Sequence, residues 1–298
     1  MIPSELVPTF GLDGSVPIPS NQLLEHAGRL KGKVVLITGA GRGIGKETAI
    51  QFANFGAKIV IGDIDLVSAQ ETANTVTSAG GQAIFQNCDV TVWDDLVDLY
   101  NLAIAKFGSV DVVVPNAGVP ETSFFYNVCF DSNGRPQEPH LREVEVNLKG
   151  VLYTAHLAQH YLRVHAGQES STKPLKAIVF IGSMSPWASY SPAPIYTATK
   201  HAILGLMRSV GPVLNNNGIR TVCITPSFAD VASSEVLFPT VIRVAGVIIY
   251  TVSHPDPAIS GCGYVLADND WKVLKVPREE FKAGVYKLLD ERVSFLLK

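Results

Sequence analysis

The sequence feature that most constrains the fold is a repeated alternation of short apolar runs with longer amphipathic stretches. It begins at about residue 33, and each short run is rich in Val and Ile. Runs of this length and composition predict buried β-strands, and the stretches between them have helical length and spacing. The predicted strands cover residues 34–38, 58–61, 83–85, 110–114, 177–181 and 221–225. The predicted helices cover about residues 46–55, 66–79, 93–107, 141–164 and 196–214.

This order of elements predicts an α/β fold built on a parallel sheet. A parallel connection needs a crossover, and the crossovers place helices on both faces of the sheet, so the strands are buried on both sides. In such sheets ligands bind beyond the carboxyl ends of the strands. We therefore expect the functional residues to follow directly after the strands.

The chain length and composition favour one large domain with extensions. Of the 298 residues, 47% are hydrophobic and 17% are charged, so the chain can bury a large core. Residues 1–30 are rich in Pro and lack sustained periodicity, which predicts an extended arm that packs over the domain or frays. We expect residues 31–298 to form the domain, with an amphipathic helix at 277–297.

Charge and cysteine content exclude several classes of protein. The formal net charge is −3, which leaves no surplus of Lys and Arg for a nucleic acid backbone. The four cysteines are widely spaced, which disfavours a metal site or a redox dithiol. The longest apolar stretch, residues 241–252, is too short to span a membrane, and residues 1–28 contain no Lys or Arg of the kind that begins a secretory signal. We expect a cytoplasmic protein with no metal.

A glycine-rich segment follows the first predicted strand. It reads Thr-Gly-Ala-Gly-Arg-Gly-Ile-Gly over residues 38–45 and leads directly into a predicted helix. Glycine lets a backbone turn tightly and approach a phosphate closely, and a helix N-terminus attracts the anion. A tight turn without a ligand is the alternative, but the strand–loop–helix context favours a dinucleotide site. The candidate residues are Gly39, Arg42, Gly43, Ile44 and Gly45.

An acidic residue ends the second predicted strand. Asp63 lies where dinucleotide-binding folds place a carboxylate on the ribose hydroxyls, and this carboxylate repels a 2′-phosphate. NAD is therefore favoured over NADP, although Arg42 is able to pair with such a phosphate. The alternative for Asp63 is a turn residue at the end of the strand. Further residues placed along the cofactor are Ile64, Asp89, Val90, Asn116, Ala117 and Gly118.

A candidate catalytic set follows the fifth predicted strand. Ser183 comes directly after it, and Tyr196 and Lys200 are separated by four positions at the start of the next predicted helix. On a helix this spacing places both side chains on one face. A phenol is a weak acid unless a nearby cation stabilises its anion, and Lys200 supplies that cation. Ser183 is suited to hold a substrate oxygen opposite Tyr196. A surface helix with a chance Tyr and Lys is the alternative.

Together these residues resemble the short-chain dehydrogenase/reductase family over about residues 31–267. The family's T-G-x-x-x-G-x-G matches residues 38–45, its N-N-A-G matches residues 115–118, and its Asn-Ser-Tyr-Lys tetrad matches Asn147, Ser183, Tyr196 and Lys200. Two departures stand out, because Pro115 replaces the first Asn and Ser227 replaces the Gly that normally follows Pro226.

The resemblance implies a single doubly wound Rossmann domain with a seven-stranded parallel sheet and a nicotinamide cofactor. It implies hydride transfer between that cofactor and an alcohol or carbonyl carbon. Tyr196 would donate or accept the proton, Lys200 would hold the nicotinamide ribose, and Asn147 would support a water chain to solvent. Pro226 and Phe228 would lie beside the nicotinamide. Residues 196–205 and 263–268 look closest to the 15-hydroxyprostaglandin dehydrogenase-like, NAD-dependent branch.

The predicted substrate side of the pocket is apolar, which favours a hydrophobic secondary alcohol or ketone. Ser183, Met184, Trp187 and Tyr196 are the candidate substrate residues, and Pro186, Ile195, Phe228, Phe124 and Phe125 are further apolar candidates. Family members commonly pair through the helices at 141–164 and 196–214, so we expect a homodimer or homotetramer. The leading interpretation is an NAD-dependent alcohol dehydrogenase. The alternatives are an NADPH-dependent ketoreductase of a biosynthetic pathway and a nicotinamide-binding protein without turnover.

Overall fold

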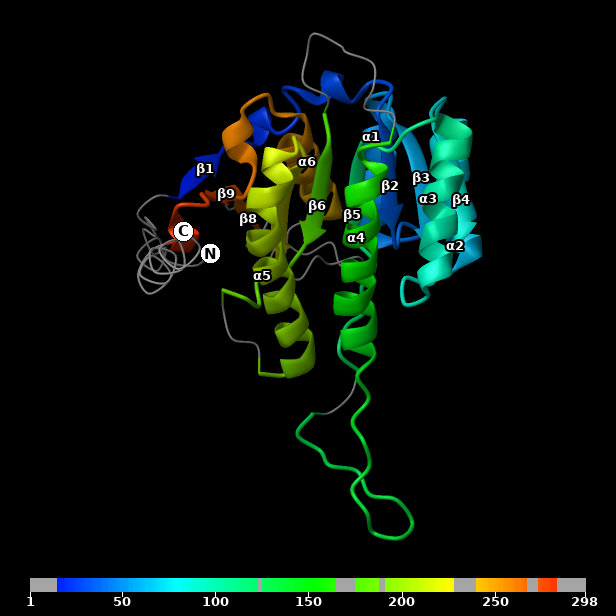
Figure 1. Cartoon of the computed structure of the whole chain (residues 1–298), viewed down its shortest axis with the longest axis vertical. Helices are drawn as coiled ribbons and strands as arrows, with labels where there is room; N and C mark the ends of the chain where they lie inside the picture. Colours follow the sequence, from blue (N-terminus) through cyan, green and yellow to red (C-terminus); the bar gives the residue numbers. More distant parts are fainter. Residues whose placement is uncertain are drawn as a thin grey trace, which may run out of the picture.

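The apolar runs pair side by side in one sheet that carries helices on both faces (Figure 1). The structure is a computed structural model, and it describes residues 15–122, 125–164, 175–187, 191–227, 240–266 and 273–282. Within these residues the sheet has nine strands in the order β1-β9-β8-β7-β6-β5-β2-β3-β4. The predicted α/β class with a doubly wound sheet is therefore confirmed.

Seven consecutive strands of this order are parallel, as predicted. In five of them almost every residue is buried, as expected for strands covered on both faces. The parallel strands are β2 (Val34–Thr38), β3 (Lys58–Asp63), β4 (Gln82–Asn87), β5 (Val112–Pro115), β6 (Ala177–Ile181), β7 (Arg220–Pro226) and β8 (Gly263–Leu266).

Two antiparallel strands at one edge were not predicted. β9 (Val273–Val276) pairs with β8, and β1 (Val16–Ile18) pairs with β9. β1 has three residues, one of which is Pro17. A short edge strand containing Pro produces no periodic signal, because it needs no apolar residue on each face. The 3-10 helices η2 (Ser20–Gln22) and η3 (Ala27–Leu30) follow β1, and Leu23 and Leu30 are buried in the core.

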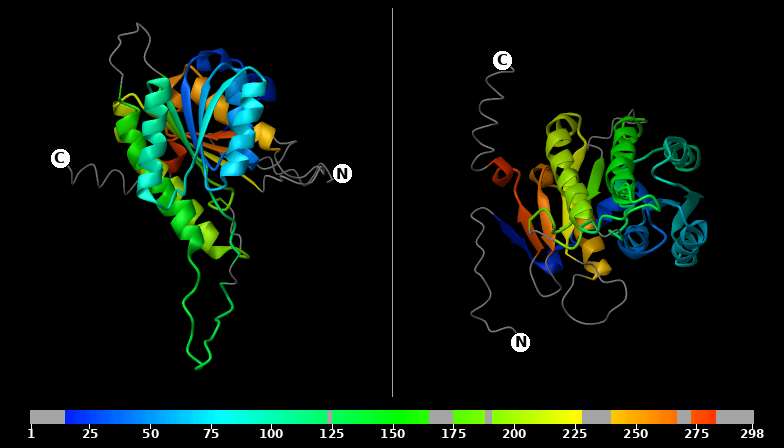
Figure 2. Two further views of the ribbon diagram at one scale, coloured as in Figure 1. Left: turned by 90° about the vertical axis from the view of Figure 1, so that its right-hand side faces the viewer. Right: turned by 90° about the horizontal axis from the view of Figure 1, so that it is seen from below.

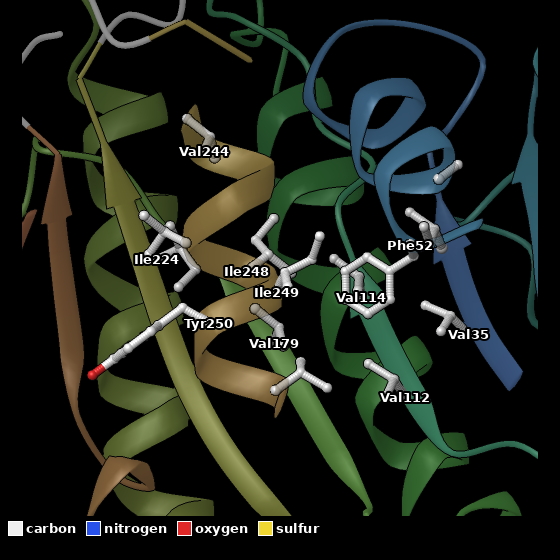
Figure 3. Packing of buried hydrophobic residues seen from close by; sticks show 14 of the residues in the cluster. Val35, Phe52, Val112, Val114, Val179, Ile224, Val244, Ile248, Ile249 and Tyr250 are labelled. Atoms are coloured by element: carbon white, nitrogen blue, oxygen red, sulfur yellow. The ribbon is translucent and has the colours of Figure 1, made fainter. Parts of the chain in front are cut away.

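Three helices cover one face of the sheet: α1 (Gly43–Asn54), α2 (Leu66–Ser78) and α6 (Val241–Ser253). Figure 3 shows Phe52 of α1 and Ile248 of α6 packed toward Val114 and Val179 of the sheet. α6 was absent from the predicted helices, although its residues are all buried from Val244 to its end. A short, nearly continuous apolar run does not by itself distinguish a buried helix from a strand. Among the described residues no helix combines the length and the hydropathy needed to cross a bilayer.

The other face is covered by α3 (Trp93–Phe107), α4 (Val151–Tyr161) and α5 (Pro194–Asn216). The helix predicted at 141–164 is in fact two segments, because a π-helix, η4 (Val144–Gly150), precedes α4 without a break. π-helical turns occur frequently at functional sites. The predicted helix at 277–297 lies mostly outside the described residues, which end in the short turn η6 (Glu280–Lys282).

The topology leaves an opening at the carboxyl ends of the strands. β2 lies between β3 and β5, so the chain leaves it in one direction and returns on its other side. This reversal is the switch point at which α/β sheets bind ligands. Between β5 and η4 the chain makes a long excursion that extends away from the body of the molecule (Figures 1 and 2). Phe130 and Pro136 form a bridge within it.

Candidate active site

A cleft of about 1280 Å³ lies at the switch point. Its walls come from the segments that follow β2, β3, β4, β5, β6 and β7, together with the start of α5 and the end of the long excursion. Most of the predicted site residues line it: Gly39, Arg42, Gly43, Ile44, Asp63, Ile64, Asp89, Val90, Asn116, Ala117, Gly118, Ser183, Met184, Tyr196, Lys200 and Pro226. The structure thus brings together residues that are far apart in the sequence.

The glycine-rich loop forms one end of the cleft. Gly39 and Gly43 have φ values of +67° and +57°, which favour glycine. A Cβ at Gly39 would lie 2.6 Å from the Cα of Ala117, and one at Gly45 would lie 2.3 Å from the carbonyl oxygen of Gly39. Gly45 is buried beneath the loop and does not line the cleft. α1 begins at Gly43, so its N-terminal N–H groups lie at the cleft wall.

Asp63 ends β3 beside this loop. Its Oδ2 accepts a hydrogen bond from the Gly41 N–H at 2.7 Å, and its Oδ1 accepts one from the Asp65 N–H at 3.0 Å. These bonds fix the carboxylate in the cleft wall, and each oxygen retains a lone pair for another donor. Arg42 is exposed at the N-cap of α1, and Ile64 is exposed next to Asp63.

Asn116 connects two neighbouring strands. Its Nδ2 donates to the carbonyl oxygens of Thr38 at 3.0 Å and Gly39 at 2.8 Å, and its backbone N–H donates to the Thr38 hydroxyl at 3.2 Å. The side chain therefore holds the ends of β2 and β5 together. The Asp89 carboxylate also makes local hydrogen bonds, because its Oδ1 accepts from both the backbone N–H and the hydroxyl of Thr91.

Tyr196 and Lys200 lie one turn apart at the start of α5. The Lys200 Nζ lies 5.6 Å from the centroid of the Tyr196 ring and donates to the carbonyl oxygen of Ile181 at 2.9 Å. Burial lowers the pKa of Lys200 to about 8, and a smaller opposing effect comes from Cys223. The ammonium is thus held between α5 and the end of β6, close to the phenol.

Ser183 lies next to the Tyr196 hydroxyl. Burial raises the pKa of the Tyr196 phenol, and a hydrogen bond with Ser183 lowers it by a smaller amount. The two hydroxyls are therefore adjacent in the cleft, as the predicted catalytic set requires. A buried phenol keeps its proton at neutral pH, which makes it available for donation.

Asn147 is fully buried in the π-helix η4 and does not line the cleft. Its Oδ1 accepts from the Val119 N–H at 2.7 Å, and its Nδ2 donates to the Val119 carbonyl oxygen at 2.9 Å. A Cβ at Gly118 would lie 3.3 Å from Asn147 Oδ1 and 3.9 Å from Lys200 Nζ. Asn147 therefore lies directly behind the cleft wall, near Lys200.

The substrate side contains both expected and unexpected residues. The Met184 N–H donates to the Pro226 carbonyl oxygen at 2.9 Å, so these two predicted residues are adjacent. The structure places Trp187 elsewhere, because its Nε1 donates to the Thr225 hydroxyl at 3.2 Å and its ring packs on Phe281. It is absent from the residues that line the cleft. The predicted residues Phe124 and Phe228 lie outside the described residues.

Three charged residues of the cleft were not predicted: Glu121, Arg142 and Glu145. Glu121 comes three positions after the Asn-Ala-Gly segment, and the other two precede Asn147 by less than two helical turns. Their closeness in the sequence to these two motifs is the signal that could have identified them. The predicted substrate side of the cleft was apolar, whereas the observed lining also includes these three charged side chains.

The cleft residues fit a nicotinamide dinucleotide. The glycine backbone and the start of α1 form a cradle that suits a pyrophosphate, and a Cβ at Gly39 or Gly45 would collide with neighbouring protein atoms and distort it. The Asp63 carboxylate at the end of β3 suits a ribose diol. Tyr196 and Lys200 lie in the same cleft, at the end formed by β6 and α5.

Comparisons with known proteins agree with this geometry. Residues 33–241 match the short chain dehydrogenase family model. The chain is 33% identical over 268 residues to "Short-chain dehydrogenase/reductase ascJ" of Acremonium egyptiacum, which covers 89% of this chain and 83% of that protein. It is 32% identical over 204 residues to (+)-borneol dehydrogenase 2 of Salvia officinalis, covering 66% of this chain and 65% of that one.

A solved structure shares the architecture. A short chain dehydrogenase from Mycobacterium avium superposes with a TM-score of 0.69 at 25% identity, covering 82% of this chain and 85% of that one. The family binds nicotinamide dinucleotides and interconverts alcohols and carbonyl compounds, as the resemblance implied. The chain belongs to the short-chain dehydrogenase/reductase family, and it is an oxidoreductase.

Proposed function

We propose that the protein is an NAD-dependent dehydrogenase of a hydrophobic secondary alcohol, or a ketoreductase in the reverse direction, with Tyr196 as the proton donor or acceptor. The observation that carries the proposal is the grouping of Tyr196, Lys200 and Ser183 in the cleft that the glycine-rich loop also lines. This grouping supplies a proton donor, a cation and an orienting hydroxyl around one position.

The cofactor would occupy the cleft from the loop to α5. The backbone of Gly39, Gly43 and Ile44 would contact the pyrophosphate, Asp63 the adenosine ribose, and Lys200 the nicotinamide ribose. Val90, Asn116, Ala117 and Pro226 would line its length. When bound, the nicotinamide supplies a hydride donor or acceptor.

The proton chemistry belongs to the residues of the chain. Ser183 would hold the substrate oxygen, and Tyr196 would donate its phenolic proton to that oxygen during reduction or accept it during oxidation. The Lys200 ammonium stabilises the phenolate that forms, because opposite charges favour ionisation of the phenol. Asn147 keeps the segment around Val119 in place behind Lys200.

The choice of NAD over NADP rests on Asp63. Its carboxylate is fixed by the Gly41 and Asp65 N–H groups and would repel a 2′-phosphate. The second candidate is an NADPH-dependent ketoreductase, which the exposed Arg42 at the same end of the cleft favours. An NAD-dependent branch similar to 15-hydroxyprostaglandin dehydrogenase agrees with the first candidate.

The substrate class rests on Met184 and Pro226 at the cleft wall and on the relatives named for borneol, a secondary alcohol. We further propose a homodimer or homotetramer in the cytoplasm. The apolar groove between α4 and α5, which includes Leu152, Tyr153 and Val210, supports the pairing of subunits through these helices.

The test is a fluorescence titration of the purified protein with NADH and NADPH, followed by a panel of hydrophobic ketones and secondary alcohols monitored at the nicotinamide absorbance. We expect tighter binding of NADH and turnover of at least one panel member. Tighter binding of NADPH would favour the second candidate. Binding without turnover of any panel member would favour a cofactor-binding protein that is not an enzyme for these substrates.

A further inference from the structure

The helix that carries Tyr196 lacks a cap of its own. The N-cap residue of α5 is Ala193, whose side chain cannot accept a hydrogen bond. Pro194 follows and has no N–H, and the first backbone bond of the helix runs from the Thr197 N–H to the Ala193 carbonyl oxygen at 2.9 Å. The N–H groups of Ile195 and Tyr196 therefore have no partner within the helix.

A carboxylate from a distant segment supplies the missing cap. Glu121, 75 residues earlier in the chain, accepts a hydrogen bond from the Tyr196 N–H through Oε2 at 2.9 Å. Tyr196 is the third residue of α5, which is the position that an N-cap side chain normally serves. A negative charge here also interacts favourably with the positive end of the helix dipole.

The segment that presents Glu121 is itself held on both sides. Asn147 makes two hydrogen bonds to Val119, and the Thr122 N–H donates to Glu143 Oε1 at 3.3 Å. Glu143 is only 2% exposed and lies directly before the π-helix that contains Asn147. Residues 119–122 thus connect the helix of Asn147 with the helix of Tyr196.

Folding alone gives little reason for a carboxylate at this position. Glu121 Oε1 is buried and makes no hydrogen bond with any residue in the described part of the chain. A buried carboxylate oxygen without a partner costs free energy, and a Ser or Asn at residue 193 would cap α5 locally without that cost. The hydrogen bond from the Tyr196 N–H to Glu121, by contrast, fixes Tyr196 relative to the cleft wall.

We propose that Glu121 is a positioning residue that fixes the backbone of Tyr196 relative to the cofactor side of the cleft. It acts through the Tyr196 N–H and touches no reacting atom. The proposal rests on the function proposed above for Tyr196. Without this contact the first turn of α5 loses its cap, so the phenol is less often aligned with Ser183 while the cofactor loop is unaffected.

The experiment compares Glu121→Ala and Glu121→Gln with the wild type and with Glu138→Ala. Gln keeps an oxygen that accepts from the Tyr196 N–H, whereas Ala does not. Glu138 is an exposed carboxylate on the same excursion and serves as the matched control. With a ketone that the wild type reduces, we would measure kcat per NADH-binding site and KM for each protein. We would also measure the Kd of NADH and Tm.

We expect Glu121→Ala to lower kcat by about tenfold or more, because small misplacement of a reacting group has effects of this size. KM and the Kd of NADH should stay within about twofold, and Glu121→Gln should recover most of the lost kcat. Counting active molecules by NADH binding separates misalignment from partial unfolding. Glu138→Ala should match the wild type in every quantity.

Three results would overturn the inference. An unchanged kcat in Glu121→Ala, with an active wild type and an inactive Tyr196→Phe, would remove the role of Glu121 and leave the proposed function intact. An equal loss in Glu121→Gln and Glu121→Ala would show that the hydrogen bond to Tyr196 is not what matters. If Tyr196→Phe were fully active, the proposed function would fail, and the role of Glu121 would fail with it.

Discussion

The Lys200 ammonium lies 5.6 Å from the centre of the Tyr196 ring and is bonded to the Ile181 carbonyl oxygen at 2.9 Å. The cation is therefore attached to the end of β6 rather than free to move with its side chain. It faces the phenol from a buried position, where a charge interacts more strongly than in water. This fixed relationship is the basis for the expected chemistry of Tyr196.

Tyr196→Phe should remove the proton donor and leave the cleft intact. Proton transfer by a side chain contributes about 10²- to 10⁴-fold to a rate, so kcat should fall by that order. The Kd of NADH should change little, because the ring remains in place. Steady-state kinetics and a fluorescence titration measure the two quantities.

Tyr161→Phe is the matched control for this substitution. The Tyr161 hydroxyl donates to Asn101 Oδ1 at 2.8 Å on the outer surface of α3 and α4, away from the cleft. It should retain wild-type kcat. If Tyr196→Phe kept its activity, a group other than Tyr196 would be the proton donor or acceptor.

The sequence predicted the parts of the fold that are buried and regular. β2 and β6 were recognisable because a strand covered on both faces is a continuous apolar run. β1 was missed because a short edge strand needs no such run, and β9, which pairs with β1 and β8, has four residues and is only partly apolar. α6 was missed because a short, nearly continuous apolar run does not by itself distinguish a buried helix from a strand.

Local spacing accounts for the part of the site that was predicted. Tyr196 and Lys200 are four residues apart on one helix, so their proximity followed from the sequence. The bond from Tyr196 to Glu121 depends on how β5 and α5 are placed in space, and no local pattern contains it. Trp187 shows the converse, because it is near Ser183 in the sequence but its side chain turns toward Thr225.

Asp63→Ala should weaken NAD binding and raise the relative affinity for NADP. The carboxylate would no longer accept from the ribose hydroxyls or repel a 2′-phosphate. Hydrogen bonds to charged groups are worth about 1.5–3 kcal/mol, so the Kd of NADH should rise by about tenfold or more. Parallel titrations with NADH and NADPH give the ratio.

Asp65→Ala is the control for this change, since it removes a carboxylate two residues away. Asp65 caps α2 by accepting from the Val67 and Ser68 N–H groups. Its loss should lower Tm without altering the preference between cofactors. If Asp63→Ala and the wild type showed the same preference between NADH and NADPH, other residues would determine the selectivity. Arg42 would be the first of these to test.

Gly39→Ala should disrupt the cradle, whereas Gly205→Ala should be tolerated. Gly39 has a φ of +67°, and an added Cβ would lie 2.6 Å from the Cα of Ala117. Gly205 lies within α5 with nothing within 4 Å of an added Cβ. We expect Gly39→Ala to lower Tm and abolish NADH binding, and Gly205→Ala to stabilise by about 0.5–1 kcal/mol. Equal NADH binding by both variants would contradict the placement of the loop.

The buried ammonium of Lys200 should make stability depend on pH. Burial lowers its pKa from 10.5 to about 8 in the folded protein. Between these two values the unfolded chain binds more protons at this residue than the folded chain, so the free energy of unfolding rises with pH. Below pH 8 both states are protonated, and the cost of burying the charge is present in full.

Lys200→Met removes this dependence and gives its size by difference. As pH increases from about 7 to about 10, the stability of the wild type relative to Lys200→Met should increase by up to about 3 kcal/mol. Urea denaturation of both proteins across this range measures the difference, in which contributions from other titrating groups largely cancel. Lys106→Met, at an exposed lysine of α3, should track the wild type at every pH. If the free energies of unfolding of the wild type and Lys200→Met differed by the same amount at every pH, the pKa of Lys200 would be near its ordinary value. Groups other than the Ile181 carbonyl would then also stabilise its charge in the folded protein.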